Sequence, residues 1–322
     1  MEHISVLLQA SIAGLNIKPD GIYVDATLGR GGHSLLIVEQ LTSGRLYCFD
    51  RDVKAIEESR ITLTKYLDKI TFIKANFAQM EEKLHELNIT GVDGILIDLG
   101  VSSPQFDDPQ RGFSYRNDAR LDMRMDQSQT LDAWEVVNNY PFNDLMRIIS
   151  RYGEESYAKQ ISRKIEARRQ IQTIDTTLDL VDVIKSALPS KVLSKKGHPA
   201  KQTFQAIRIE VNGELDALGK VLEQGIDLLR PDGRFCVITF HSLEDRIVKE
   251  KFNEVSTIKV PRKLPIAELP QADYETLTRK ALVADEEELQ GNKRSHSAKL
   301  RILRKRGIYH GEESQKNPFE TF

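Results

Sequence analysis

The feature that most constrains the fold is a glycine-rich loop between two strand-like runs. Residues 22–26 have the alternating pattern of a strand, and a helical pattern begins after the loop that follows them. That loop contains Gly29, Gly31 and Gly32. A second apolar run ends in Asp50, twenty-one residues after Gly29. Because glycines let the backbone approach a ligand and a carboxylate ending the second strand can bind a ribose diol, the segment predicts a nucleoside-containing cofactor.

Strand and helix patterns alternate through the first hundred residues, and the last of these strands ends in Asp98. Between about residues 105 and 200 no comparable strand appears. Helical patterns occupy that region, over residues 131–137, 143–152, 154–169 and 178–188. The alternation predicts a doubly wound α/β sheet. We therefore expect a discontinuous α/β domain, residues 1–104 and 203–322, interrupted by a helical insertion over 105–202.

The α/β pattern resumes after the insertion. Apolar residues spaced by 3 or 4 predict helix from 204 to 229, with a break at Asn212-Gly213. A turn at 230–233 should lead into a buried strand over 233–240. The alternation at 299–304 predicts a last strand at the edge of the sheet.

Composition excludes several classes of protein. No run approaches the 18 or more apolar residues of a membrane span, and the N-terminus lacks the pattern of a secretion signal. Cys48 and Cys236 lie in apolar runs without a CxxC partner, so we expect reduced, buried thiols and a cytoplasmic protein. No recognisable set of metal ligands is present, and no metal is expected.

The net charge of −2 is unevenly distributed. Residues 147–201 hold 12 Lys and Arg against 6 Asp and Glu, and residues 292–306 hold 7 Lys and Arg with no acid. Basic regions on a nearly neutral chain suggest a polyanionic partner. Solvated helix faces are the alternative for either region.

Several polar residues stand where ligands bind in open parallel sheets, at the ends of strands. Asp98 ends one strand, and His241 to Asp245 follow another. Glu244 and Asp245 could instead simply occupy the first turn of a helix. His33 could start the helix after the loop or contact a ligand. Ser34 replaces the third glycine of the dinucleotide fingerprint, which argues against NAD or FAD.

Longer strings carry a resemblance to a known family. They are Asp25-Ala-Thr-Leu-Gly-Arg-Gly-Gly-His33, Asp98-Leu-Gly-Val-Ser-Ser-Pro-Gln105, Leu121-Asp-Met-Arg-Met125, Tyr152-Gly-Glu-Glu155, Thr203-Phe-Gln-Ala-Ile-Arg208, Val211-Asn212 and Phe240-His-Ser-Leu-Glu-Asp-Arg246. Over residues 3 to 305 the chain resembles the bacterial small-subunit ribosomal RNA methyltransferase H family, also called MraW. The resemblance implies a Rossmann-like methyltransferase sheet with an inserted all-helical substrate-recognition domain.

The resemblance also implies S-adenosylmethionine as the cofactor and assigns residues to it. Gly31, Gly32 and His33 should surround the methionine part, and Asp50 should bind the ribose hydroxyls. Phe77 should lie near the adenine, Asp98 near the adenine or the amino-acid end, and Gln105 should close over the site.

The implied reaction is methyl transfer to the exocyclic N4 amine of a decoding-centre cytidine in 16S rRNA, with the 30S subunit as partner. Asp98, or the backbone carbonyls of Ser102 and Ser103, would accept hydrogen bonds from the amine. Ser103-Pro104-Gln105 lacks the second proline and the aromatic residue that many amino-methylating enzymes carry there. A nicotinamide oxidoreductase and a non-catalytic ribosome-assembly factor are the alternatives, and a homodimer is left open.

Overall fold

The computed structural model describes residues 5–100, 108–258 and 271–307. The chain forms two compact units, one of residues 1–100 with 217–322 and one of residues 101–216. The second boundary lies later than the expected 202/203, because helix α11 (Lys201–Asn212) packs against α6 (Ala133–Asn139) and α7 (Phe142–Arg151) of the helical unit.

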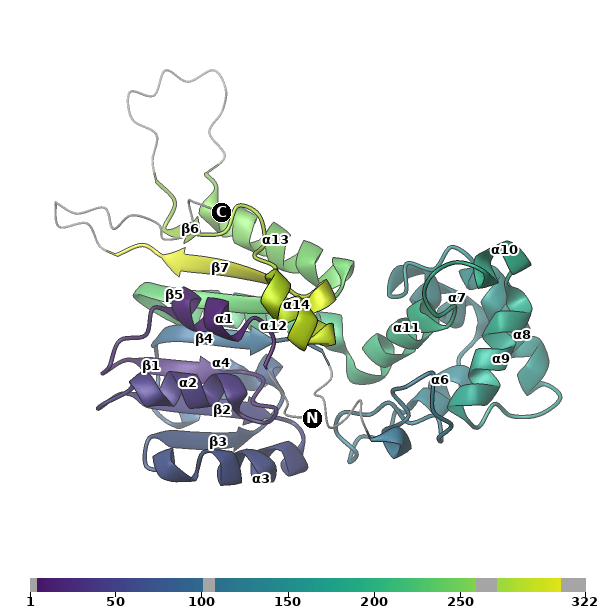
Figure 1. Cartoon of the computed structure of the whole chain (residues 1–322), viewed down its shortest axis with the longest axis horizontal. Coiled ribbons are helices and arrows are strands. Elements are labelled where there is room, and N and C mark those ends of the chain that lie inside the picture. Colours follow the sequence, from purple (N-terminus) through teal and green to yellow (C-terminus); the bar gives the residue numbers. More distant parts are fainter. Residues whose placement is uncertain (1–4, 101–107, 259–270, 308–322) are drawn as a thin grey trace, which may run out of the picture. The chain divides into compact units, whose positions relative to one another are not determined.

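The first unit is built on a seven-stranded sheet of order β3-β2-β1-β4-β5-β7-β6 (Figure 1). Its strands are β1 (Ile22–Asp25), β2 (Arg45–Asp50), β3 (Ile70–Lys74), β4 (Val92–Asp98), β5 (Leu229–Thr239), β6 (Tyr274–Thr276) and β7 (Lys299–Lys305). The five strands from β3 to β5 are parallel, and β7 runs antiparallel to both of its neighbours. The predicted α/β sheet is thereby confirmed.

Helices cover both faces of this sheet (Figure 1). They are α1 (Leu8–Leu15), α2 (Gly32–Gln40), α3 (Val53–Thr62), α4 (Met80–Glu86), α12 (Glu214–Leu228), α13 (Ser242–Ser256) and α14 (Glu286–Gly291). Successive strand side chains enter opposite cores: Leu96 packs with the cluster under α1 and α2, and Ile95 and Ile97 pack with the cluster under α4 and α12. Burial on both faces explains why β4 is an unbroken apolar run.

Two details of the predicted strands differ in the structure. Residues 230–233, expected as a turn, lie within β5 as a bulge that is exposed over residues 230–232. Leu229 pairs with Val92 and Arg234 with Gly94, and Asp232 has a φ of 64°. The expectation that β7 is an edge strand was wrong. It lies between β5 and β6, and β6 comes from a polar stretch that shows no strand pattern.

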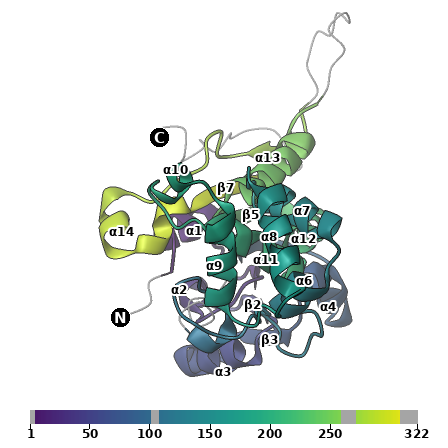
Figure 2. The ribbon, with the colours of Figure 1, turned by 90° about the vertical axis from the view of Figure 1, so that its right-hand side faces the viewer.

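The second unit is helical in its described part, residues 108–216 (Figure 2). It contains α6 (Ala133–Asn139), α7 (Phe142–Arg151), α8 (Ala158–Arg169), α9 (Thr177–Ala187), α10 (Ser190–Leu193) and α11 (Lys201–Asn212). The four predicted helical patterns correspond to α6–α9, and Thr176 caps α9 through a capping box with Asp179. Helix α11 ends at Asn212 because Gly213 adopts a φ of 59°, as its sequence predicted.

Candidate functional site

Three acids end three neighbouring strands of the sheet. Asp50 ends β2, Asp25 ends β1 and Asp98 ends β4, and the order of these strands is β2-β1-β4. Because the strands are parallel, the three carboxyl groups lie at one edge of the sheet. In open α/β sheets that edge is where ligands bind.

The glycine loop is bonded to the strands on both sides of β1. The Leu28 amide donates to the Phe49 carbonyl on β2 at 2.9 Å. The Asp98 amide donates to Thr27 Oγ1 at 2.6 Å, and the Gly29 amide donates to Asp50 Oδ2 at 3.0 Å. The structure therefore brings the loop, Asp50 and Asp98 together.

The glycines of the loop have different roles. Gly29 and Gly31 adopt φ values of 50° and 76°, which favour glycine. An added Cβ on Gly31 would also lie 3.2 Å from Leu63 Cδ1. Gly32 is the first residue of α2, and a Cβ there would clash with the Ser5 hydroxyl. Gly32 therefore also serves packing against the N-terminal segment.

Asp50 is half-buried, and backbone amides engage both of its carboxylate oxygens. Besides the bond from Gly29, the Asp52 amide donates to Oδ1 at 2.9 Å. Burial raises the pKa of Asp50 to about 6, although these hydrogen bonds lower it. The carboxyl group is therefore mostly ionised at pH 7 and keeps lone pairs for further donors.

Phe77 lies beyond the end of β3, the strand next to β2. The Ala75 amide donates to the Asp50 carbonyl at 3.1 Å, and the Asn76 side chain caps the short helix that begins at Phe77. The Phe77 ring is half-buried against the apolar cluster that includes Phe49. Its backbone neighbours thus connect it to the Asp50 end of the sheet.

Asp98 has the most perturbed carboxyl group at this edge. Burial, then the charges of Asp25 and Glu244, raise the pKa of Asp98 to about 8, and Arg294 opposes the rise. Its Oδ1 is buried and makes no hydrogen bond within the described residues. A buried acceptor without a partner is costly unless a ligand satisfies it.

The His33 side chain is buried next to Asp98. The ring is buried, its Nε2 lies 3.1 Å from the Val6 carbonyl oxygen, and its Nδ1 lies 4.0 Å from Asp98 Oδ2. Burial lowers the pKa of His33 to about 4, so the imidazole is neutral. Since a carbonyl can only accept, Nε2 carries the proton and Nδ1 turns a lone pair toward Asp98.

Asp25 is the third acid at this edge of the sheet, beside Asp50 and Asp98. The sequence analysis gave it no role of its own. It is fully buried, accepts a hydrogen bond from Ser34 Oγ at 2.6 Å and has its pKa raised to about 6 by burial. Ser34, which replaces the third fingerprint glycine, therefore holds this carboxyl group. The signal for Asp25 was available: like Asp50 and Asp98, it ends a strand.

The residues after β5 have capping and pairing roles. His241 is the N-cap of α13, and Glu244 completes a capping box with it. Asp245 pairs with Arg301 at 2.7 Å and with Lys299 at 3.1 Å. Arg304 pairs with Glu275 in the same way. Three of the four cations of β7 are thus engaged with acids of the same unit, and Lys305 donates to the Leu229 carbonyl at 2.8 Å, so this strand is not an open basic patch.

Some predicted positions lie outside the described residues, namely Gln105 and the Ser102 and Ser103 carbonyls. Within residues 5–100, 108–258 and 271–307, no group of three His, Cys, Asp or Glu side chains could hold a metal ion. Over the same residues, no helix is long and apolar enough to span a bilayer. Cys48 and Cys236 are both buried free thiols.

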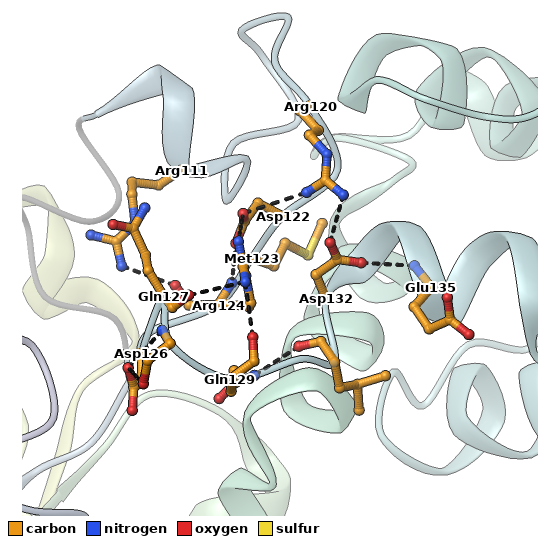
Figure 3. Close-up of polar contacts among 12 residues, drawn as sticks. Arg111, Arg120, Asp122, Met123, Arg124, Asp126, Gln127, Gln129, Asp132 and Glu135 are labelled. Carbon is orange, nitrogen blue, oxygen red and sulfur yellow. Dashed lines mark hydrogen bonds and ion pairs between the residues drawn. The ribbon is translucent and has the colours of Figure 1, made fainter.

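The helical unit contains a second polar cluster, around the string Leu121-Asp-Met-Arg-Met125 (Figure 3). The Asp122 carboxylate accepts from Arg124 Nε at 2.9 Å and Nη2 at 2.7 Å. Burial alone would raise the pKa of Asp122, but these hydrogen bonds hold it below its ordinary value. Arg120 bridges Asp122 and Asp132. The string is therefore held in one conformation by paired charges.

Asn212 at the end of α11 fastens the same string. Its Oδ1 accepts from the Met125 amide at 2.8 Å, and its Nδ2 donates to the Met123 carbonyl at 2.8 Å. Met123 has a φ of 58°, a conformation that side chains rarely adopt. The sequence showed these two segments as separate strings, and the fold makes them one structural element.

Asn212→Ala should destabilise the helical unit, because buried backbone groups of Met123 and Met125 lose their side-chain partners. We expect a cost of roughly 2–4 kcal/mol in the free energy of unfolding. Urea denaturation measures it. Asn139→Ala is the control, since the Asn139 side chain is exposed and, among the described residues, donates to the Glu135 side chain alone. Equal midpoints for the two variants would contradict this role.

The strand order and the acidic edge define the class. A parallel sheet with a glycine loop after β1, an acid ending β2 and an antiparallel β7 is the architecture of a Rossmann-like enzyme that binds a nucleoside cofactor. The family model described as the MraW methylase family matches residues 1–306. The chain therefore belongs to the MraW methylase family, whose methyl donor is S-adenosylmethionine.

Several solved structures are similar to this chain. A putative rRNA-methylase from Clostridium thermocellum is 14% identical with a TM-score of 0.43, over 94% of this chain and 100% of that one. TrmN from Thermus thermophilus is 13% identical with a TM-score of 0.41, over 93% and 48%. SMU.1697c, a putative methyltransferase from Streptococcus mutans in complex with SAH, is 13% identical with a TM-score of 0.39, over 94% and 99%. These likenesses are weak, and the fold class rests on the strand order.

The residues present fit S-adenosylmethionine. The cofactor offers a ribose diol, which needs an acceptor, and the Asp50 carboxylate is such a group. It also carries positive charges, and Asp98 presents a buried carboxyl oxygen without a partner among the described residues. Gly29 and Gly31, which adopt positive φ values, carry no Cβ that could keep a ligand from the backbone of the loop beside the same acids.

Proposed function

We propose that this protein transfers a methyl group from S-adenosylmethionine to the N4 amine of a cytidine in the decoding centre of 16S rRNA. The observation that carries the proposal is the match of the MraW methylase family to residues 1–306, on a chain whose Asp50 and Asp98 meet at the glycine loop. The family favours methyl transfer over the nicotinamide alternative.

We assign the cofactor contacts as follows. Asp50 would accept from the ribose hydroxyls, Phe77 would lie near the adenine, and Gly31, Gly32 and His33 would surround the methionine part. When bound, S-adenosylmethionine supplies a methyl group on a cationic sulfur. Gln105 remains a proposed contact that closes over the site.

Asp98 is the residue we propose for the chemistry. A cytosine amine is a weak nucleophile, because its lone pair is delocalised into the ring. An acceptor that binds the amine hydrogens and holds the nitrogen in line with the methyl group would assist the transfer. The Oδ1 of Asp98, which has no partner in the part of the chain that the structure describes, is suited to accept such a hydrogen bond, and the Ser102 and Ser103 carbonyls are the other proposed acceptors.

The helical unit is the proposed substrate-recognition domain, and 16S rRNA within the 30S subunit is the proposed substrate. The cytidine must leave its stack to reach an acid at the edge of the sheet. Residues 147–201 carry an excess of basic residues, and phosphate contacts from this unit would hold the flanking RNA.

A labelling experiment tests the proposal. Purified protein is incubated with methyl-labelled S-adenosylmethionine and 30S subunits from cells that lack the gene, and the rRNA is digested to nucleosides for mass spectrometry. We expect label in N4-methylcytidine, and a lower initial rate of labelling with the Asp50→Ala variant when S-adenosylmethionine is below saturation. Label in another nucleoside would contradict the cytidine assignment, and no label would favour an assembly factor without catalysis.

A further inference from the structure

The longest stretch of one charge sign in the helical unit surrounds α10. Residues 183–209 contain five Lys, one Arg and one His, and no Asp or Glu. Four of these lysines fall within eleven residues: Lys191, Lys195, Lys196 and Lys201. We name residues 190–201 the lysine turn. Its charge cannot be neutralised by acids of its own segment.

The lysine turn is compact, so its charges are concentrated. The amides of Leu193 and Ser194 donate to the carbonyls of Pro189 and Ser190, and the Lys195 amide donates to Val192 at 3.1 Å. All four lysine side chains of the turn are exposed. Gly197 has a φ of 107° and open space where a Cβ would stand. A ligand can therefore approach the backbone there as well as the lysines.

Several other basic residues of the helical unit form ion pairs or donate hydrogen bonds to backbone carbonyls within it. Arg124 and Arg120 pair with Asp122, and Arg208 pairs with Glu214 at 2.8 Å. Arg169 donates to the carbonyls of Val137 and Tyr140. The described contacts give the side chains of Lys191, Lys195, Lys196 and Lys201 no such partner.

An aromatic stack anchors the lysine turn. The His198 and Tyr115 rings stack with centroids 4.3 Å apart and planes 15° apart, and Phe204 contacts Tyr115 edge-on at 5.8 Å. His198 Nδ1 accepts from the Ala200 amide at 3.2 Å. Burial first, then the charges of Lys185 and Arg116, lower the pKa of His198. The imidazole of His198 is therefore neutral. Lys185 and Arg116 add two positive charges close to the lysine turn.

We propose that the lysine turn is a contact surface for the phosphate backbone of RNA. A concentrated set of exposed ammonium groups without acids matches the charge of a polyphosphate, and lysine binds phosphate as a point charge. This inference rests on the proposed function and specifies which surface of the helical unit holds the substrate RNA.

The salt dependence of RNA binding gives a quantitative test. Each phosphate neutralised contributes roughly 0.7–0.9 to the slope of log K against log salt. Changing Lys191, Lys195 and Lys196 together to Glu should reduce that slope by about 2–3 and weaken binding at least about tenfold near 0.1 M salt. Changing the same three residues to Arg should leave the slope and the affinity for RNA unchanged, since the positive charges remain.

The experiment measures binding of the full-length protein to a 16S rRNA fragment containing the decoding region, at several salt concentrations. The matched control reverses Lys65, Lys220 and Lys249, which are three exposed lysines of the sheet unit and its helices. Binding of S-adenosylmethionine and the thermal midpoint are measured on every variant. They should be unchanged by the reversal in the lysine turn, because the altered side chains are exposed.

The outcomes separate this inference from the proposed function. If wild type methylates 30S subunits but the reversal in the lysine turn behaves like the control, the surface assignment is wrong and the function stands. If RNA binding depends on the lysine turn but no methyl group is transferred, the function is wrong and the surface stands. An acidic protein that competes for the lysine turn while RNA does not would overturn the surface assignment.

Discussion

Asp50→Asn is expected to weaken binding of S-adenosylmethionine at least about tenfold, because hydrogen bonds to a charged acceptor contribute roughly 1.5–3 kcal/mol each. The Gly29 and Asp52 amides hold the carboxylate in place, at 3.0 and 2.9 Å. Asparagine keeps the shape of the side chain and loses its charge. Titration calorimetry measures the affinity directly.

The control for this variant is Asp52→Asn, two residues away. Asp52 caps α3 by accepting from the Lys54 amide, and asparagine caps a helix about as well. The control makes the same change in charge and should leave affinity within about twofold of wild type. Equal loss in both variants would show that general electrostatics, and not a ribose contact, explains the result.

Asp98→Asn should have opposite effects on cofactor affinity and on stability. A cationic ligand favours the ionised carboxylate, and the pKa of about 8 means that the free protein must release a proton to provide it. Wild-type affinity for S-adenosylmethionine should therefore fall by roughly fiftyfold between pH 8 and pH 6, as the ionised fraction of the free carboxyl group falls. The variant should bind weakly, with little dependence on pH over this range.

The same variant, Asp98→Asn, should be more stable than wild type at high pH, although it binds the cofactor more weakly. A carboxyl group whose pKa is raised in the folded state stabilises the fold below its ordinary pKa, near 4, and this contribution is lost as the pH rises through 8. Asparagine has no such loss. The variant should therefore exceed wild type by about 1–3 kcal/mol in free energy of unfolding near pH 9, and the difference should vanish toward pH 4.

Urea denaturation across this pH range measures the difference, with Asp68→Asn as the control. Asp68 is exposed, so its variant should follow wild type at every pH. If Asp98→Asn is less stable than wild type near pH 9, the carboxyl group makes favourable contacts when ionised. Its proposed role as an acceptor waiting for a ligand would then be wrong.

Much of the fold could be predicted because it depends on local patterns. The apolar run ending at Asp98 predicted a strand buried on both faces, and β4 is such a strand. The spacing of 3 or 4 after Thr203, with its break at Gly213, predicted α11 and α12. Prediction failed where a strand has little pattern of its own: β6 is three residues long and exists because β7 offers it backbone partners.

The candidate site divides in the same way. Asp50 and Asp98 could be found because strand ends are recognisable in a sequence, and parallel strands bring those ends to one edge. The burial that raises the Asp98 pKa, the position of His33 behind it and the role of Ser34 at Asp25 were not predictable. Each depends on residues distant in the chain, such as Val6, which accepts from His33.

The basic stretches show the difference most clearly. Residues 299–306 and 190–201 both appear in the sequence as dense positive charge. In the structure the first is largely neutralised by Asp245 and Glu275, while the second remains exposed around α10. The sequence alone determined the α/β pattern, the glycine loop and the acids at its strand ends, because these depend on near neighbours. Only the tertiary structure decided which charges are paired and which carboxyl oxygen is buried without a partner among the described residues, because pairing and burial depend on segments that folding brings together.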